Sequence, residues 1–192
     1  MMQNTVIKKS IGFAILTAMI CGCAATSNYY ILSTASKPSA VYTQHQKTIG
    51  IEKVSVPKYL FKREIAIAKS SSEVAFLSDG SWAEDMDEGL TQRLVGFIQK
   101  KFNQPQVYEY PWGVDVQPNI KVRVQITRYI AEGNFVYLDA NWHIEDLQTH
   151  QSEAQLFSVK VPTKNDTKSI VAAMDQAFGK FEESIAQGIH RF

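Results

Sequence analysis

The sequence has 192 residues, of which 45% are hydrophobic, and its 20 lysines and arginines nearly balance its 19 aspartates and glutamates. This length fits one ordinary domain together with a short targeting segment. Because the formal net charge is only +1 at pH 7, no strongly basic field would attract a polyanion. Nucleic acid is therefore disfavoured as a partner.

Residues 1–22 predict a secretory signal peptide. Lys8 and Lys9 form a short positive region, no acidic residue occurs before the cut, and an apolar run extends from Ile11 to Ile20. Ten helical residues rise only about 15 Å, half of a bilayer's hydrocarbon core, so this run is too short to span a membrane. A buried N-terminal helix is disfavoured because the run has no polar stripe. A positive start, a short apolar core and a small residue at the cut define a secretory signal.

The junction Ile20-Cys21-Gly22-Cys23 resembles the lipobox of bacterial lipoproteins, which has an aliphatic residue, a variable residue, a small residue and then the acylated cysteine. Cys21 does not fit, because Ile20 would then occupy the position of the small residue. The resemblance implies that Cys23 is the lipid-attachment site, and two or more acyl chains hold a protein firmly on a membrane. Ala24 follows, and it is not the aspartate that commonly retains such proteins at the inner membrane. We therefore expect an outer-membrane, lipid-anchored protein that faces the periplasm.

Composition divides the remaining chain into two parts. Residues 23–48 are rich in small polar residues and predict an acylated tether, interrupted by a short strand candidate at Tyr29–Leu32. Residues 49–192 predict a single periplasmic α+β domain. Its core alone must stabilise it, because no cysteine follows Cys23 and a disulfide is excluded within the domain.

Strands and helices alternate along this domain. We expect a strand over 49–56, a hairpin of strands 64–69 and 73–77, and a first helix that Ser81 and Glu84 cap as a capping box. Its end is expected at 103–105.

The clearest alternation of apolar and polar residues lies in 120–127, followed by a tight joint and a partner strand over 136–145. A third strand is expected over 155–161 and a last amphipathic helix over 167–188. Strands with one apolar face imply an antiparallel sheet covered on one side only. The predicted fold class is α+β, a two-layer arrangement with two amphipathic helices packed on one face of an antiparallel sheet.

The sequence contains no pattern that indicates catalysis. Its histidines are scattered and none stands at metal-ligand spacing on a predicted helix: His45, His143, His150 and His190. Neither a nucleophile elbow nor a glycine-rich phosphate loop occurs. The carboxylates around 84–88 lie in the first turns of a predicted helix, where they compensate the macrodipole. We expect a protein that is not an enzyme, with no catalytic residue, no metal and no cofactor besides the acyl chains on Cys23.

Two stretches with large apolar side chains are candidate contact surfaces. One is Val56–Arg63, where apolar side chains are flanked by cations, and the other is Tyr108–Gly113, an aromatic loop. Exposed aromatic residues beside arginine are enriched in interfaces. The alternative is that these rings only cover the core. The candidate contacts with a partner or a second copy are Tyr59, Leu60, Arg63, Tyr110 and Trp112.

The order of several segments makes the chain similar to the ABC-type transport auxiliary lipoproteins, the PqiC-like group. These segments are spread over nearly the whole chain after the signal: the lipobox, Tyr29–Leu32, Val54–Leu60, Trp82–Glu84, Ala140-x-Trp142-x-Ile144 and Ala172–Ile189. The resemblance rests on their order and spacing together.

The resemblance implies an outer-membrane accessory subunit of an MCE-type lipid transport system that supports envelope integrity. Its implied partners are a PqiB-like MCE protein, whose periplasmic tunnel it would dock, and further copies of itself in a homo-oligomer. Two other roles remain open: an accessory to an ABC permease with a single-MCE-domain protein, and a lipoprotein chaperone for outer-membrane protein assembly. A hydrolase is a remote further alternative.

Overall fold

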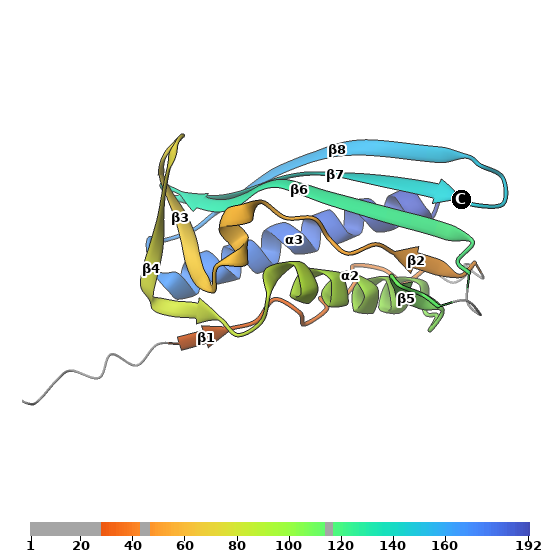
Figure 1. Ribbon diagram of the computed structural model, residues 1–192, viewed down its shortest axis with the longest axis horizontal. Helices are drawn as coiled ribbons and strands as arrows, with labels where there is room; N and C mark the ends of the chain where they lie inside the picture. The colour runs from red at the N-terminus through yellow and green to blue at the C-terminus, as the bar shows by residue number, and fades with distance from the viewer. Residues whose placement is uncertain (1–27, 43–46, 114–116) are drawn as a thin grey trace, which may run out of the picture.

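The computed structural model describes residues 28–42, 47–113 and 117–192. The predicted signal peptide and Cys23 therefore lie outside the described residues. An eight-stranded sheet forms one layer, and the helices α2 (Met86–Phe102) and α3 (Thr167–Ile189) form the other. Figure 1 shows both helices beneath the same face of the sheet. The predicted α+β class, with two helices on one face of a sheet, is confirmed.

Three long strands form the part of the sheet that α3 covers: β6 (Ile120–Glu132), β7 (Phe135–Asp146) and β8 (Ser152–Pro162). They pair antiparallel in sequence order, as expected for these three strands. Buried and half-exposed residues alternate along the whole of β7. The two-residue period of a strand thus places one apolar row against the helices and one polar row outward.

The rest of the sheet contains parallel pairs, so the sheet is mixed and not antiparallel throughout. Two short segments, β2 (Ile49–Ile51) and β3 (Glu64–Ser70), both run parallel to β6, at opposite ends of it. β4 (Glu73–Trp82) forms the predicted hairpin with β3, while β1 (Asn28–Tyr30) and β5 (Val107–Glu109) run parallel to β4 and β2. Alternation of apolar residues specifies which face is buried, but it carries no information on strand direction.

The first helix begins later than predicted, and the expected capping box is wrong. Ser81 belongs to β4, and Asp85 is the residue that precedes the helix. The Glu84 carboxylate instead accepts hydrogen bonds from the backbone N–H groups of Leu32 (3.2 Å) and Ser33 (3.0 Å). Glu84 therefore holds an N-terminal segment that lies far away in the sequence.

That segment, residues 31–42, lies against both helices, and we call it the strap. The hydroxyl of Ser36 donates to Glu182 Oε2 (2.7 Å), and the N–H of Ser39 donates to Glu183 Oε1 (2.8 Å). Residues 31–42 belong to the stretch that we expected to be a tether. The predicted boundary at residue 48 remains a prediction, but the described part of the stretch packs on the domain.

A buried ion pair lies beneath the strap and joins the two helices. Arg93 of α2 donates from Nε to Glu182 Oε1 (3.1 Å) and from Nη2 to Glu182 Oε2 (3.2 Å), and both side chains are fully buried. Burial alone would lower the pKa of Arg93, but the carboxylates of Glu182 and Asp175 raise it above the ordinary value. The guanidinium also donates to the Leu32 carbonyl (3.5 Å). One charged group thus connects α2, α3 and the strap.

Candidate functional site

The first predicted contact stretch forms a single 3₁₀ turn, η1 (Lys58–Phe61). Leu60 is only 3% exposed and belongs to the core, whereas Phe61 next to it is 57% exposed. Consecutive residues of a tight turn point in different directions, so one of this pair is buried while the other is exposed. Leu60 is therefore corrected from a candidate contact to a core residue.

Tyr59 has a structural role. Its hydroxyl oxygen accepts the backbone N–H of Tyr129 (2.9 Å), and burial raises the pKa of Tyr59. The same side chain lines an open groove of about 480 Å³ between η1, the β3–β4 hairpin and β6. Val74 and Arg128 also line this groove.

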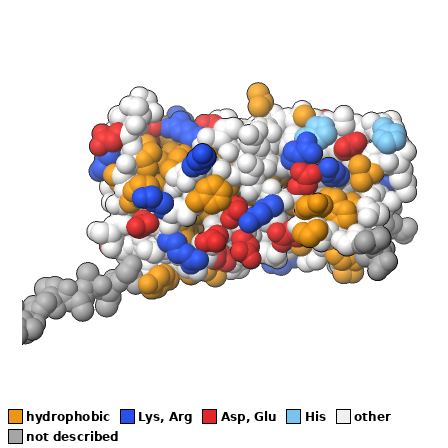
Figure 2. All heavy atoms as spheres, in the orientation of Figure 1, with side chains coloured by type: hydrophobic (Ala, Val, Ile, Leu, Met, Phe, Trp, Pro, Cys, Tyr) orange, Lys and Arg blue, Asp and Glu red, His pale blue; other side chains and the backbone are white. Residues whose placement is uncertain are grey.

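A mixed apolar and cationic surface lies next to this groove, and we call it the hairpin surface: Phe61, Lys62, Arg63, Val74 and Phe76. Its apolar members Val74 and Phe76 are 39% and 37% exposed and are paired in register with Ala68 and Ala66. The Lys62 ammonium lies 4.8 Å from the centre of the Phe76 ring. Figure 2 shows hydrophobic side chains over the hairpin at the left, with lysine, arginine and acidic side chains around them. Sequence reasoning missed the β4 residues, although their two-residue spacing places them on one face.

Arg63, the predicted contact on this surface, also supports the local structure. It donates to the carbonyl of Ala83 (2.7 Å) and to the carboxylate of Asp85 (3.1 Å). Both charged side chains of this ion pair are more than half exposed, so water screens it and it contributes little to stability. The guanidinium remains accessible from solvent.

The second predicted contact stretch is the aromatic loop, Tyr108–Gly113, whose first two residues belong to β5. Tyr110 is 56% exposed, and its ring stands edge-on to Trp112 with 4.9 Å between the centroids. Trp112 packs close to Gly50, where an added Cβ would lie 3.0 Å from the indole ring. The N–H of Tyr110 donates to the carbonyl of Ile51 (2.8 Å). The loop is thus fixed to the sheet at its base and presents an aromatic side chain outward.

Acidic side chains lie beside the aromatic loop. Burial raises the pKa of Glu109, and the nearby carboxylates of Glu88 and Asp87 raise it further, while Lys53 opposes them. The Lys53 ammonium is paired with Asp87 at 2.8 Å, and Gln92 donates to Glu109. The surroundings of the loop are therefore rich in carboxylates, whereas the hairpin surface includes the cations Lys62 and Arg63. β5 and the β3–β4 hairpin lie toward opposite ends of the molecule (Figure 1).

A metal site and a membrane span each place a requirement on the described part of the chain. Within residues 28–42, 47–113 and 117–192, no three His, Cys, Asp or Glu side chains are grouped so that they could hold a metal ion. No helix in these ranges is long and apolar enough to cross a membrane. Of the predicted site residues, the structure places Tyr59 and Arg63 in and just after η1, Tyr110 and Trp112 after β5, and Leu60 in the core. Whether the exposed ones contact a partner remains a prediction.

The family model for the ABC-type transport auxiliary lipoprotein component matches residues 30–186. The chain belongs to this family. The match begins in β1 and ends in α3, so it covers the strap, the sheet and both helices of this auxiliary lipoprotein. The predicted resemblance is thereby confirmed, together with the role of an auxiliary component in a transport system.

Solved structures share the fold of this auxiliary lipoprotein. One, described as an uncharacterized protein, is 20% identical, with a TM-score of 0.71 over 85% of this chain and 99% of its own. Protein XCC0632 from Xanthomonas campestris is 16% identical, with a TM-score of 0.69 over 86% of this chain and 94% of its own. No curated protein matches the sequence.

Proposed function

We propose that the protein is an outer-membrane lipoprotein, acylated at Cys23, that serves as a non-catalytic accessory subunit of an MCE-type lipid transport system. Its partner in this proposal is a PqiB-like MCE protein, whose periplasmic tunnel it docks, and it acts as a homo-oligomer. The observation that carries the proposal is the family match over residues 30–186, which makes the chain an auxiliary component of transport. The lipobox supplies the anchor, and the outer membrane follows from Ala24 after the acylated cysteine.

The two candidate surfaces suit different contacts, one with the membrane anchor and the other with a partner protein. In this proposal the anchored end of the domain is the hairpin end, because the described chain begins at Asn28 in β1, which pairs with β4 of the hairpin. The aromatic loop lies toward the other end, where it is free to meet a partner in the periplasm. Aromatic side chains on a fixed loop are suited to this role because they bury a large area at low entropic cost. We assign the docking contact to Tyr110 and Trp112.

A pull-down tests this assignment. The acylated protein is extracted from native membranes in detergent, and the proteins that co-purify are identified by mass spectrometry. We expect an MCE-domain protein among them. Truncating a hot-spot aromatic side chain costs about 2 kcal/mol or more, so Tyr110→Ser should deplete the MCE protein strongly if Tyr110 is the docking contact. Trp112 is less suitable for the first test because it also packs against Gly50.

Leu156→Ser is the matched control, because Leu156 is 84% exposed and lies on β8, away from the loop. This variant should retain the MCE protein. A barrel protein without any MCE-domain protein would overturn the proposal and favour the chaperone role. A permease with a single-MCE-domain protein would keep the transport role but change the system. If Tyr110→Ser recovered as much MCE protein as the unsubstituted protein, the aromatic loop would not be the docking contact.

A further inference from the structure

The position of the first described strand limits how far the domain can move from its anchor. Asn28, Tyr29 and Tyr30 pair with Gly80, Ser81 and Trp82 of β4, and the N–H of Ala83 donates to the Tyr30 carbonyl (2.8 Å). From Cys23 to Asn28 there are only five residues, which span about 18 Å when fully extended. An acyl chain on Cys23 therefore holds the β1 end of the domain within that distance of the bilayer surface.

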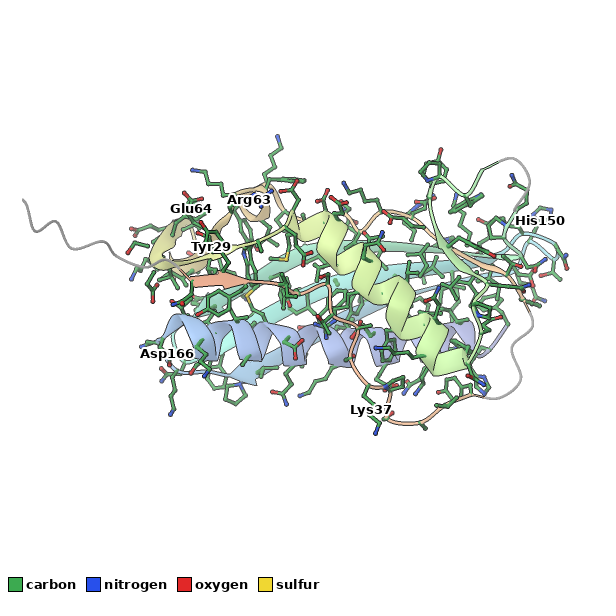
Figure 3. All side chains as sticks on the ribbon, turned by 90° about the horizontal axis from the view of Figure 1, so that it is seen from below. Tyr29, Lys37, Arg63, Glu64, His150 and Asp166 are labelled. Carbon is green, nitrogen blue, oxygen red and sulfur yellow. The ribbon has the colours of Figure 1, made fainter. Side chains whose placement is uncertain are left out.

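The hairpin surface lies at this same end. Figure 3 labels Tyr29, Arg63 and Glu64 together at the end where the described chain begins, and His150 at the opposite end. Along β4, Phe76 is five residues from Ser81, the partner of Tyr29, which corresponds to about 17 Å of strand. The anchor and the hairpin surface can therefore meet one plane.

The composition of the hairpin surface fits a phospholipid headgroup region. Phe61, Val74 and Phe76 are exposed apolar side chains, and such side chains beside lysine and arginine are typical of protein segments that lie at a membrane interface. Lys62 lies over the Phe76 ring, and none of the ion pairs among the described residues includes it. Its ammonium is thus held at the surface without a protein carboxylate, where a lipid phosphate would complete the pair.

We propose that the hairpin surface lies on the phospholipid bilayer, with Val74 and Phe76 in the headgroup region and Lys62 against lipid phosphates. This inference rests on the proposed acylation of Cys23, and it adds a second contact that fixes the orientation of the domain. Two contacts some distance apart prevent the domain from swinging about a single anchor. The aromatic loop then points into the periplasm.

The acylated protein with Val74→Cys tests this orientation. The sequence has two cysteines, of which one leaves with the signal peptide and the other carries lipid, so the new thiol is labelled alone with an environment-sensitive fluorophore. The labelled protein is reconstituted into vesicles of phosphatidylethanolamine and phosphatidylglycerol that contain a lipid with a nitroxide near its headgroup. We expect the nitroxide to quench most of the fluorescence at position 74. Leu156→Cys, on β8, and His150→Cys, at the far end, are the controls and should stay bright.

The charge contribution is separated by a second variant. In the Val74→Cys background, quenching should be stronger in the anionic vesicles than in vesicles of phosphatidylcholine alone, and Lys62→Glu should abolish that difference. Protein that floats with the vesicles but shows equal quenching at all three labelled positions would overturn the orientation while leaving the anchor intact. Protein that does not float would overturn the anchor and the orientation together. Label at position 74 that is already shielded from aqueous iodide in detergent would identify a second protein copy as the occupant, which also overturns the proposal.

Discussion

Replacing Arg93 by methionine should destabilise the domain severely. Both Arg93 and Glu182 have fully buried side chains, so water cannot solvate the carboxylate that the change leaves behind. The variant loses both hydrogen bonds from Arg93 to Glu182, at 3.1 and 3.2 Å, and those to Asp175 and Leu32. Among the described residues, the hydroxyl of Ser36 then remains as a donor to Glu182. At about 1.5–3 kcal/mol for each charged hydrogen bond, and about 3–5 kcal/mol for breaking a buried ion pair, the expected loss is about 4 kcal/mol. That loss is a large fraction of an ordinary domain's stability.

Urea denaturation followed by far-UV circular dichroism measures this loss as a change in the free energy of unfolding. The double variant Arg93→Met with Glu182→Leu removes both charges, and it should recover most of the stability, because apolar residues of similar volume replace buried ion pairs without large cost. A loss below about 1 kcal/mol for the single variant, or a double variant less stable than the single one, would refute the reasoning.

The pH dependence gives an independent check. Burial raises the pKa of Glu182 above its ordinary value of 4.5, and the Arg93 guanidinium is the main opposing influence. Without Arg93 the pKa of Glu182 must rise further. A carboxyl whose pKa is higher in the folded chain than in the unfolded chain favours folding at low pH, and this contribution is lost as pH rises through the folded value. The deficit of Arg93→Met should therefore be full at pH 7 and shrink in acid.

Two further predictions concern the sheet and its helix. The Lys47 ammonium and backbone N–H groups lower the pKa of Asp146 from 3.8 to about 2. The ionised Asp146 therefore stabilises the fold above pH 3.8, and this contribution is lost as pH falls toward 2. Asp146→Asn should lower the free energy of unfolding by about 2 kcal/mol at pH 7 and remove the acid-dependent part of a urea or thermal stability profile. Gly188→Ala would place a Cβ 2.6 Å from Ile144 and should destabilise the domain by about 1–3 kcal/mol through overpacking. The Cβ of Gly179→Ala would meet its nearest neighbour only at 3.6 Å. This second variant should stabilise α3 by up to about 1 kcal/mol in the same assay. A neutral Asp146→Asn, or a stabilising Gly188→Ala, would contradict these contacts.

The elements with strict periodicity could be predicted from the sequence. Segments 120–127 and 136–145 alternate without interruption, and they form β6 and β7 because one face of each is covered by a helix and the other is open. The last helix, predicted over 167–188, extends to residue 189. The residues within each of these elements show its period by themselves, so the element can be predicted without knowing its distant partners.

Elements that depend on distant residues could not be predicted in this way. The strap has no apolar period, and it is ordered by Glu84, Glu182 and Glu183, which lie 51 or more residues away. Glu84 stands three residues after a serine, and this local pattern matches a capping box although its true partners are in the strap. The spacing of Ser81 and Glu84 alone cannot distinguish a carboxylate that caps a helix from one that binds the strap.

The candidate site was predicted only in part, for a similar reason. Composition identified Phe61 and its neighbours as a possible surface, but the direction of each side chain depends on a 3₁₀ turn that no periodicity indicates. Leu60 was therefore predicted to be a contact, although its side chain is buried in the core. The role proposed for Val74 and Phe76 depends on β1, which places the start of the described chain beside the hairpin.

The strap also sets the order in which the chain can be completed. Ser36 and Glu182 are 146 residues apart, and Ser39 and Glu183 are 144 apart. Closing such long loops costs entropy and slows the contacts that depend on it. A chain that emerges N-terminus first can bind the start of its strap to Glu84, but the contacts of Ser36 and Ser39 must wait until α3, the last element, has formed. The strap is thus among the last segments to be completed, although it lies near the start of the described chain.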